Sequence, residues 1–367
     1  MKPRLLISVV VLTICFGESG CVSQALTKAI TEAPNRRGVP QVLRPESAER
    51  LRRDDQAFSA SWMLSVGPPA AELSIAVVEP GDYHLIHTIE IGPFKNGRAH
   101  VWPKDEWTLP AHVPGLVAQP PKATVLVLHG YQDSKEDMMH WAIYLAQAGY
   151  RIVLVDLRGH GRSTGNWIGY GAFEAHDLQQ VVDDLQKRGL VSGPLGVFGL
   201  SYGASVGLQL AGNDKRIGAV VALEPFSDPR RAVAEFARAV VPNLVKGWSD
   251  RDFANAEDRA GRLAHFSWQD ADVLGSVART TAPILYVYAE HDHWISPENT
   301  RLLASKTQSL HSVLTVGFTN DGGLEDHVLL SWTLDPFAPE VVKWLDAALV
   351  GGGPGLKERL MALGFIR

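Results

Sequence analysis

The serine at position 201 has the sequence context of a reactive nucleophile. It stands in Gly199-Leu200-Ser201-Tyr202-Gly203, after the apolar run 195–198 and before the helix-forming run 204–211. A short strand, a sharp turn and a helix present such a serine in a strained backbone conformation, and side chains at the flanking glycine positions would clash there. The pattern predicts a nucleophile elbow with Ser201 at its tip.

A serine hydroxyl is a weak nucleophile until a base removes its proton. His327 is the candidate base, because it follows the irregular stretch 317–326 after the last predicted strand. Asp292 lies just beyond the strand that ends at Ala289, and it is the candidate acid that fixes the imidazole tautomer. Glu224, at the end of an earlier strand, is the rival for the role of the acid.

Other titratable residues leave further alternatives. His129 and His160 lie inside backbone motifs and are poor candidates for the base. Glu325 and Asp326 directly precede His327, and they are either ordinary loop charges or carboxylates that raise the pKa of its imidazole.

The candidate residues follow strands that alternate with helices. Nearly continuous apolar runs at 123–128, 151–156, 217–223 and 283–289 are typical of strands buried on both faces. The connections between them are long enough for helical crossovers, so the pattern predicts a mostly parallel, doubly wound α/β sheet with helices on both faces. Reactive groups collect past the carboxyl ends of strands in such a sheet.

Two stretches depart from this rhythm. Between positions 224 and 281 the strands stop, and 230–241 and 251–266 favour helices, so this insertion is predicted to form a small helical cap over the sheet. Before the first parallel strand, the β-type runs 73–78, 83–91 and 98–102 are predicted as antiparallel first strands of the sheet.

Taken together, these motifs resemble those of the α/β-hydrolase superfamily of serine hydrolases over about residues 83–349. His129-Gly130-Tyr131 stands at the position of the superfamily's oxyanion loop, 156–163 resembles its D-x-R-G-x-G-x-S loop, and 292–297 resembles its acid loop. The resemblance implies a triad of Ser201, Asp292 and His327 in which the backbone N–H groups of Tyr131 and Tyr202 bind the oxyanion. The Tyr131 hydroxyl is the alternative donor. Arg158 and Ser163 are expected to brace their loop.

The resemblance implies cleavage of a carboxylic ester, or of a thioester, through an acyl-enzyme on Ser201. A serine peptidase or amidase of the prolyl-peptidase type is one alternative, although the roughly 70 residues before the first strands are too few for that group's propeller. A non-catalytic binding protein on the same fold is the other. Five tryptophans either line an acyl pocket or belong to the core: Trp141, Trp167, Trp248, Trp268 and Trp294.

The composition of the chain limits the classes of partner and substrate that it can bind. The chain has 367 residues, of which 46% are hydrophobic, enough for one large domain with additions. A net charge of −5 without a basic patch argues against nucleic acid. The sequence contains neither an H-E-x-x-H motif nor a dinucleotide fingerprint, so we expect a small-molecule ester or acyl substrate with no metal and no cofactor.

The N-terminal residues have a pattern that is typical of an export signal. Basic Lys2 and Arg4 precede the apolar run 5–16, and small residues lead to Cys21, so 1–21 is predicted as a leader. The Ser-Gly-Cys ending resembles a bacterial lipobox, although Glu18 departs from that pattern. It implies lipidation of Cys21 and a location at the cell envelope or in the periplasm.

The remaining boundaries follow from composition. Residues 22–70 are predicted as a linker and N-terminal helical segment, a linker or weakly ordered to about position 45 and with a helix over 46–63. Residues 71–350 form the hydrolase domain, and 351–367 form a short amphipathic tail after a glycine-rich hinge.

Overall fold

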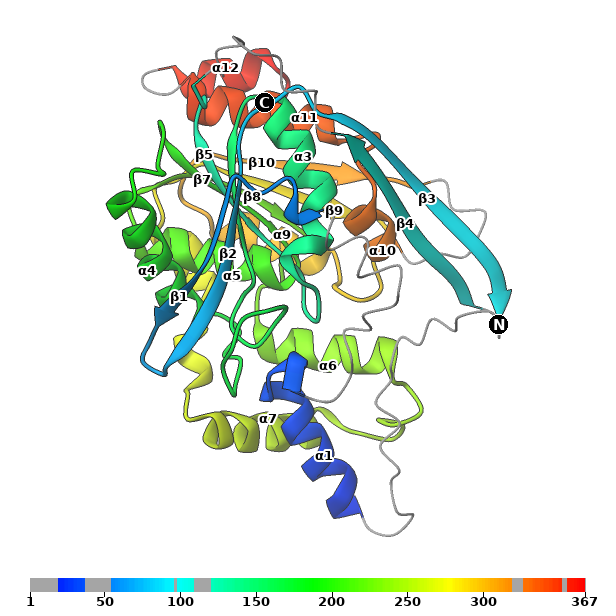
Figure 1. Cartoon of the computed structure of the whole chain (residues 1–367). Coiled ribbons are helices and arrows are strands. Elements are labelled where there is room, and N and C mark those ends of the chain that lie inside the picture. Colours follow the sequence, from blue (N-terminus) through cyan, green and yellow to red (C-terminus); the bar gives the residue numbers. More distant parts are fainter. Residues whose placement is uncertain are drawn as a thin grey trace.

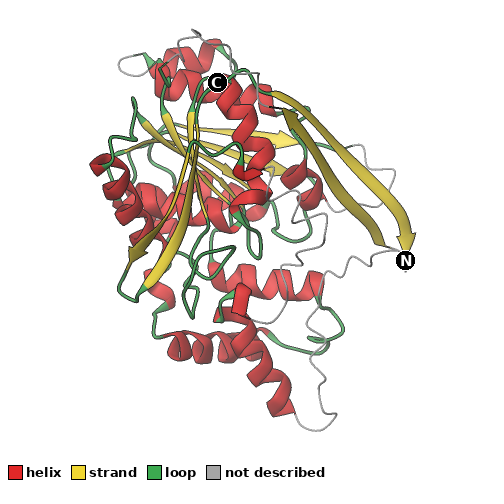
Figure 2. Cartoon of the chain, in the orientation of Figure 1, coloured by secondary structure: helices red, strands yellow, loops and turns green. Residues whose placement is uncertain are grey.

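A single eight-stranded sheet carries the elements of the predicted site. The structure, a computed structural model, describes residues 19–36, 54–95, 98–108, 120–318, 326–351 and 355–366. The strands follow the order β1-β2-β6-β5-β7-β8-β9-β10, while β3 and β4 pair only with each other (Figures 1 and 2). The strands are β1 (Ala60–Val66), β2 (Ala71–Val78), β3 (His84–Lys95), β4 (Arg98–Thr108), β5 (Thr124–Leu128), β6 (Arg151–Val155), β7 (Leu195–Leu200), β8 (Ile217–Leu223), β9 (Ile284–Ala289) and β10 (His311–Val316).

Helices cover both faces of this sheet (Figure 2). They are α1 (Ser19–Thr31), α3 (Met139–Gln147), α4 (Glu174–Lys187), α5 (Tyr202–Asn213), α6 (Pro229–Val240), α7 (Asp250–Ala264), α8 (Val273–Arg279), α9 (Glu298–Lys306), α10 (Asp326–Trp332), α11 (Ala338–Leu345) and α12 (Leu356–Ala362). None of the helices in the described ranges is long and apolar enough to cross a membrane.

The central strands are apolar throughout because both of their faces are buried. Leu126 and Leu128 of β5 belong to one core cluster, with α4 and α5, whereas Val125 and Val127 belong to a second, with α3 and α11. In the sheet order, neighbouring strands from β6 to β10 run parallel, and only the pairs β1–β2 and β2–β6 are antiparallel. The predicted doubly wound α/β fold is therefore confirmed.

The first strands differ from the prediction. The segments predicted over 83–91 and 98–102 form β3 and β4, an antiparallel ribbon that projects from the body instead of joining the sheet (Figure 1). The place next to β2 is taken by β1, whose first residues, 60–63, were predicted as the end of a helix over 46–63. Side chains of β1 alternate between exposed and half-buried, and this period of two fits an edge strand.

The predicted linker is also wrong where the structure describes it. Residues 19–31 form α1, in which Leu26 and Ile30, one helical turn apart, are buried at 8% and 3% exposure. Their partners lie far along the chain, since α1 packs against α7. Residues 1–18, the side chain of Cys21 and residues 37–53 lie outside the described part, so the leader and lipidation stay predictions.

The predicted insertion divides into two parts. Helices α6 and α7 pack on each other beside the carboxyl edge of the sheet, with α1 against α7 (Figure 1). The third helix, α8, belongs to the body, because it packs closely on α5: a Cβ added at Gly212 would lie 2.6 Å from the Ser276 side chain. We use "cover" below for α1, α6 and α7 together.

Candidate active site

Ser201 occupies the sharp turn between β7 and α5. Its backbone angles, φ 48° and ψ −107°, lie in a region that residues other than glycine rarely adopt. A Cβ added at Gly199 would lie 2.5 Å from the Gly203 carbonyl oxygen, and one at Gly203 would lie 2.5 Å from the Leu128 oxygen. Both glycines are therefore required for the elbow that the sequence predicted.

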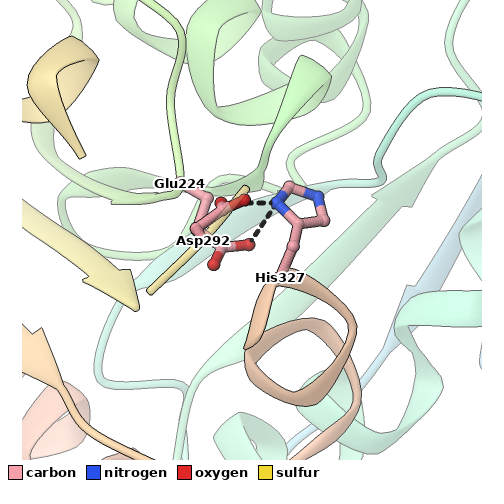
Figure 3. Close-up of side chains that lie close together, drawn as sticks. All are labelled: Glu224, Asp292 and His327. Atoms are coloured by element: carbon pink, nitrogen blue, oxygen red, sulfur yellow. Dashed lines mark hydrogen bonds and ion pairs between the residues drawn. The ribbon is translucent and has the colours of Figure 1, made fainter. Parts of the chain in front are cut away.

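The imidazole of His327 meets a buried carboxylate. His327 lies in the first turn of α10, and its Nδ1 is 2.8 Å from Asp292 Oδ2, in the loop after β9 (Figure 3). Asp292 Oδ1 accepts backbone N–H bonds from Trp294, at 2.7 Å, and from Ile295, at 2.8 Å. These bonds hold the carboxylate in place, and with Nδ1 bonded to it, Nε2 is the ring atom available to act as a base.

The rival acid reaches the same nitrogen. Glu224 ends β8, has a left-handed φ of 50°, and places Oε2 2.9 Å from His327 Nδ1 (Figure 3). Its side chain has no solvent exposure, and this burial raises the pKa of Glu224 to about 8. The structure thus brings together both carboxylates that the sequence offered as alternatives.

The imidazole responds to both charges. Burial alone would lower the pKa of His327, but the charges of Glu224 and Asp292, when both are ionised, outweigh it and raise that pKa well above its usual value. Asp326, an alternative source of such a shift, instead has Oδ2 3.3 Å from the His291 backbone N–H. Glu325 lies outside the described residues.

Ser201 and His327 do not contact each other through a hydrogen bond in this structure. Among the described residues, no hydrogen bond links Ser201 Oγ to His327, and the backbone N–H of Ser201 donates to the Leu223 oxygen at 2.7 Å. Hydrogen bonds of catalytic groups are often long before a substrate binds.

Tyr131 and Tyr202 lie on either side of the elbow. Tyr202 is the first residue of α5, and Tyr131 follows β5, the neighbour of β7; their rings are 6.2 Å apart. The Tyr202 hydroxyl donates to Glu174 at 2.9 Å, and the Tyr131 hydroxyl donates to the Ala29 oxygen of α1 at 3.3 Å. With both hydroxyls engaged elsewhere, this arrangement favours the backbone N–H groups as oxyanion donors.

A row of aromatic rings runs from Tyr131 to His327. The Phe236 ring, on α6, is 5.9 Å from Tyr131 and 5.7 Å from Trp294, each edge-on, and Trp294 is 5.3 Å from the His327 ring. The sequence did not single out Phe236; its only signal was an aromatic residue in the predicted cap.

Two cavities of about 430 and 160 Å³ are lined by other residues, so neither opens onto the candidate triad.

The remaining motif residues are structural. Arg158 forms a two-pronged ion pair with Asp177, and the Ser163 hydroxyl donates to the Asp156 oxygen at 2.6 Å, so both brace their loop as predicted. His129 Nε2 accepts the Leu157 backbone N–H at 3.0 Å. Of the five tryptophans, Trp294 lies beside His327, while Trp141 stacks on Phe198 in the core.

The same three side chains are also of the types that can bind a metal ion. Glu224, Asp292 and His327 offer ligand atoms within 4.8 Å of one another, and they are the one such group in the ranges that the structure describes. The backbone N–H bonds to Asp292 and its bond to Nδ1 account for this arrangement without an ion. The same set of groups can also act as a base held by an acid.

The sheet order, the elbow and the acid loop define the class of the protein: the chain has the α/β-hydrolase fold, as the sequence predicted, and it is similar to serine hydrolases of that superfamily. A family model described as "Serine aminopeptidase, S33" matches residues 119–272. This range includes the oxyanion loop, the elbow and most of the insertion.

Two known proteins are similar to part of the chain. It is 26% identical over 187 residues to the uncharacterized protein YqkD of Bacillus subtilis, covering 50% of this chain and 59% of that protein. It is 32% identical over 124 residues to the bifunctional esterase/perhydrolase DCH of Acinetobacter calcoaceticus, covering 34% and 39%. The matches therefore span less than two thirds of either relative.

The fold also matches a solved structure. The Pyrococcus furiosus esterase Pf2001 superimposes with a TM-score of 0.52 at 17% identity, over 80% of this chain and 93% of that one. At this level of identity the likeness concerns the fold alone.

Proposed function

We propose that the protein hydrolyses a carboxylic ester through an acyl-enzyme on Ser201. His327 Nε2 takes the proton of the Ser201 hydroxyl as Oγ attacks the ester carbonyl carbon. The backbone N–H groups of Tyr131 and Tyr202 stabilise the oxyanion, each contributing on the order of 3 kcal/mol. The ester C–O bond then breaks, and the imidazolium returns the proton to the departing alcohol.

The second half of the reaction repeats these roles with water. His327 takes a proton from a water molecule that attacks the acyl carbon, and then protonates Ser201 as the carboxylic acid leaves. The observation that carries the proposal is the hydrogen bond of 2.8 Å between His327 Nδ1 and Asp292, because it leaves Nε2 as the basic atom. The similarity to an esterase/perhydrolase favours an ester as the substrate.

The test is hydrolysis of p-nitrophenyl esters from acetyl to palmitoyl, together with labelling by a fluorophosphonate probe. We expect turnover and labelling of the native protein and neither in Ser201→Ala. Ser205→Ala, one turn further along α5, is the matched control, because its hydroxyl contacts the Phe226 backbone. A native protein that resists the probe would contradict the proposal and favour the binding-protein alternative.

A peptide or amide is the second candidate substrate, and the match to the serine aminopeptidase model favours it. The same Ser201 chemistry would then form the acyl-enzyme while expelling an amine. Aminoacyl p-nitroanilides separate the two candidates: labelling by the probe with turnover of anilides but of no ester would replace esterase by peptidase.

We also propose that Cys21 anchors the mature protein at the bacterial cell envelope. Support comes from the leader-like run before it. Intact-mass measurement on protein from the membrane fraction tests this directly. A mass that fits an unmodified Cys21 would reject the anchor.

A further inference from the structure

Glu224 is a second buried carboxyl group behind the base, and a Ser-Asp-His triad does not need it. We propose that Glu224 and Asp292 share one proton, with Glu224 as the protonated carboxyl group and Asp292 as the ionised partner that orients His327. Glu224 then acts as a positioning residue that keeps the imidazole neutral. The role of Glu224 in catalysis rests on the proposed function, whereas the location of the proton does not.

The first argument is the number of protons available at Nδ1. This nitrogen carries at most one hydrogen, yet Asp292 Oδ2 lies 2.8 Å away and Glu224 Oε2 lies 2.9 Å away. Only Asp292 has hydrogen-bond geometry with the ring. The single N–H of His327 therefore serves Asp292, and Glu224 needs another way to satisfy its oxygens.

The second argument is the unequal support of the two carboxyl groups. Asp292 Oδ1 accepts two backbone N–H bonds, which stabilise a negative charge there. Neither oxygen of Glu224 has a hydrogen-bond partner among the described residues, and the side chain is entirely buried. An ionised carboxylate is poorly tolerated in such a place, so the proton belongs on Glu224.

The third argument is the proximity of the two groups. The ligand atoms of the cluster lie within 4.8 Å of one another, and two carboxylates this close in a buried site both remain ionised only beside a cation, which here would be a protonated His327. Burial and the charge of Asp292 raise the pKa of Glu224 more than the His327 ring lowers it, which favours a proton on Glu224 at neutral pH. The pair then carries one negative charge instead of two.

The state of this pair decides whether the base works. If both carboxylates were ionised, their charges would hold a proton on the imidazole, and a protonated Nε2 cannot accept the proton of Ser201. With the proton on Glu224, the same set of groups leaves Nε2 unprotonated, so that it can accept the proton of Ser201. The left-handed backbone of Glu224, at φ 50°, is a strained conformation of the kind found at functional sites.

Three substitutions at the pair test the inference. Glu224→Gln replaces a neutral carboxyl group by a neutral amide of the same shape, so kcat should stay within about threefold of the native value. Glu224→Leu removes the carboxyl group that is proposed to carry the shared proton, and kcat should fall more than about tenfold. Asp292→Asn removes the orienting charge, and kcat should fall by about 10³-fold to 10⁴-fold.

Infrared spectroscopy supplies a readout that needs no substrate. The difference spectrum between native protein and Glu224→Gln at neutral pH should contain the C=O absorption of a protonated carboxyl group. Glu257→Gln is the matched control: Glu257 is a buried carboxylate of the cover that pairs with Arg230 at 2.8 Å, and its removal should leave that absorption in place.

Three outcomes would overturn the inference: a loss in Glu224→Gln as large as in Asp292→Asn, native activity in Glu224→Leu, or a difference spectrum without the carboxyl absorption. A native protein inactive on esters and anilides would defeat the proposed function alone. The infrared result would still decide where the proton resides.

Discussion

The carboxyl edge of the sheet and the cover beside it are built in opposite ways. At the edge, β5, β7 and β9 are buried along their whole length, and each ends next to a residue of the site. In the cover, the side chains that α6 buries are small, chiefly Ala232, Ala234 and Ala237, and its large ring, Phe236, is only partly buried. The difference teaches that the sheet holds the residues of the site in place by full burial, whereas α6 faces them with a ring that is held less tightly.

Removing the nucleophile should have the largest effect and should leave the cover untouched. Ser201→Ala is expected to lower kcat by about 10⁴-fold to 10⁶-fold, because no other group on the edge can form the acyl-enzyme. Ester hydrolysis measures the loss, and circular dichroism should show an unchanged fold. Residual activity above one-hundredth of native would mean that another residue is the nucleophile.

Damage to the elbow itself should cost stability as well as activity. In Gly203→Ala the new Cβ would lie 2.5 Å from the Leu128 oxygen and 2.6 Å from the His129 oxygen, so β5 and α5 must separate. We expect the free energy of unfolding to fall by about 2–3 kcal/mol, measured by chemical denaturation.

Gly218→Ala is the control for that comparison. Its nearest neighbour would be Leu349 Cδ2, at an ordinary 3.4 Å, and its φ is not left-handed. Equal stability losses in the two variants would show that the elbow is less tightly packed than the distances indicate.

Changing the cover should alter selectivity more than rate. Phe236→Ala removes the ring between Tyr131 and Trp294, so bulky acyl groups gain room near Ser201. We expect kcat/KM to rise about tenfold for long p-nitrophenyl esters and to stay nearly constant for acetate. Arg231→Ala, an exposed change on the same helix, should leave the acyl preference as it is; a shift there would assign the effect to the helix as a whole.

The smallest effect is expected at the contact between the two regions. Tyr131→Phe removes the hydroxyl that donates to Ala29, which should lower stability by about 1 kcal/mol. Activity should remain within about twofold, because the backbone N–H stays in place. A loss of about 10²-fold would instead identify the hydroxyl as the oxyanion donor.

The sequence was most informative where local pattern and tertiary burial agree. The apolar run 123–128 and the elbow around Ser201 carry their own signals, since full burial and a tight turn each demand particular residues. Asp292 and His327 could be placed by their positions after strands, and the structure brings these two together.

What the sequence could not reveal depends on contacts between distant segments. The burial of Leu26 and Ile30 depends on the packing of α1 against α7, and the ribbon of β3 and β4 depends on which strands pair. Glu224 was treated as a substitute for Asp292, because chain position cannot show that two strand ends meet at one nitrogen atom. Phe236 had no pattern of its own.

The position of α1 has a consequence for biosynthesis. The hydroxyls of Tyr131 and Tyr170 donate to the Ala29 and Ile30 oxygens, and α1 packs on α7, so its partners span residues 131 to 264. A ribosome makes α1 first, and Leu26 and Ile30 then stay without their native neighbours until α7 emerges. The cover can therefore be completed only after α7 has been made and, for an exported chain, has crossed the membrane, and a chaperone that recognises apolar helices has that interval in which to bind α1.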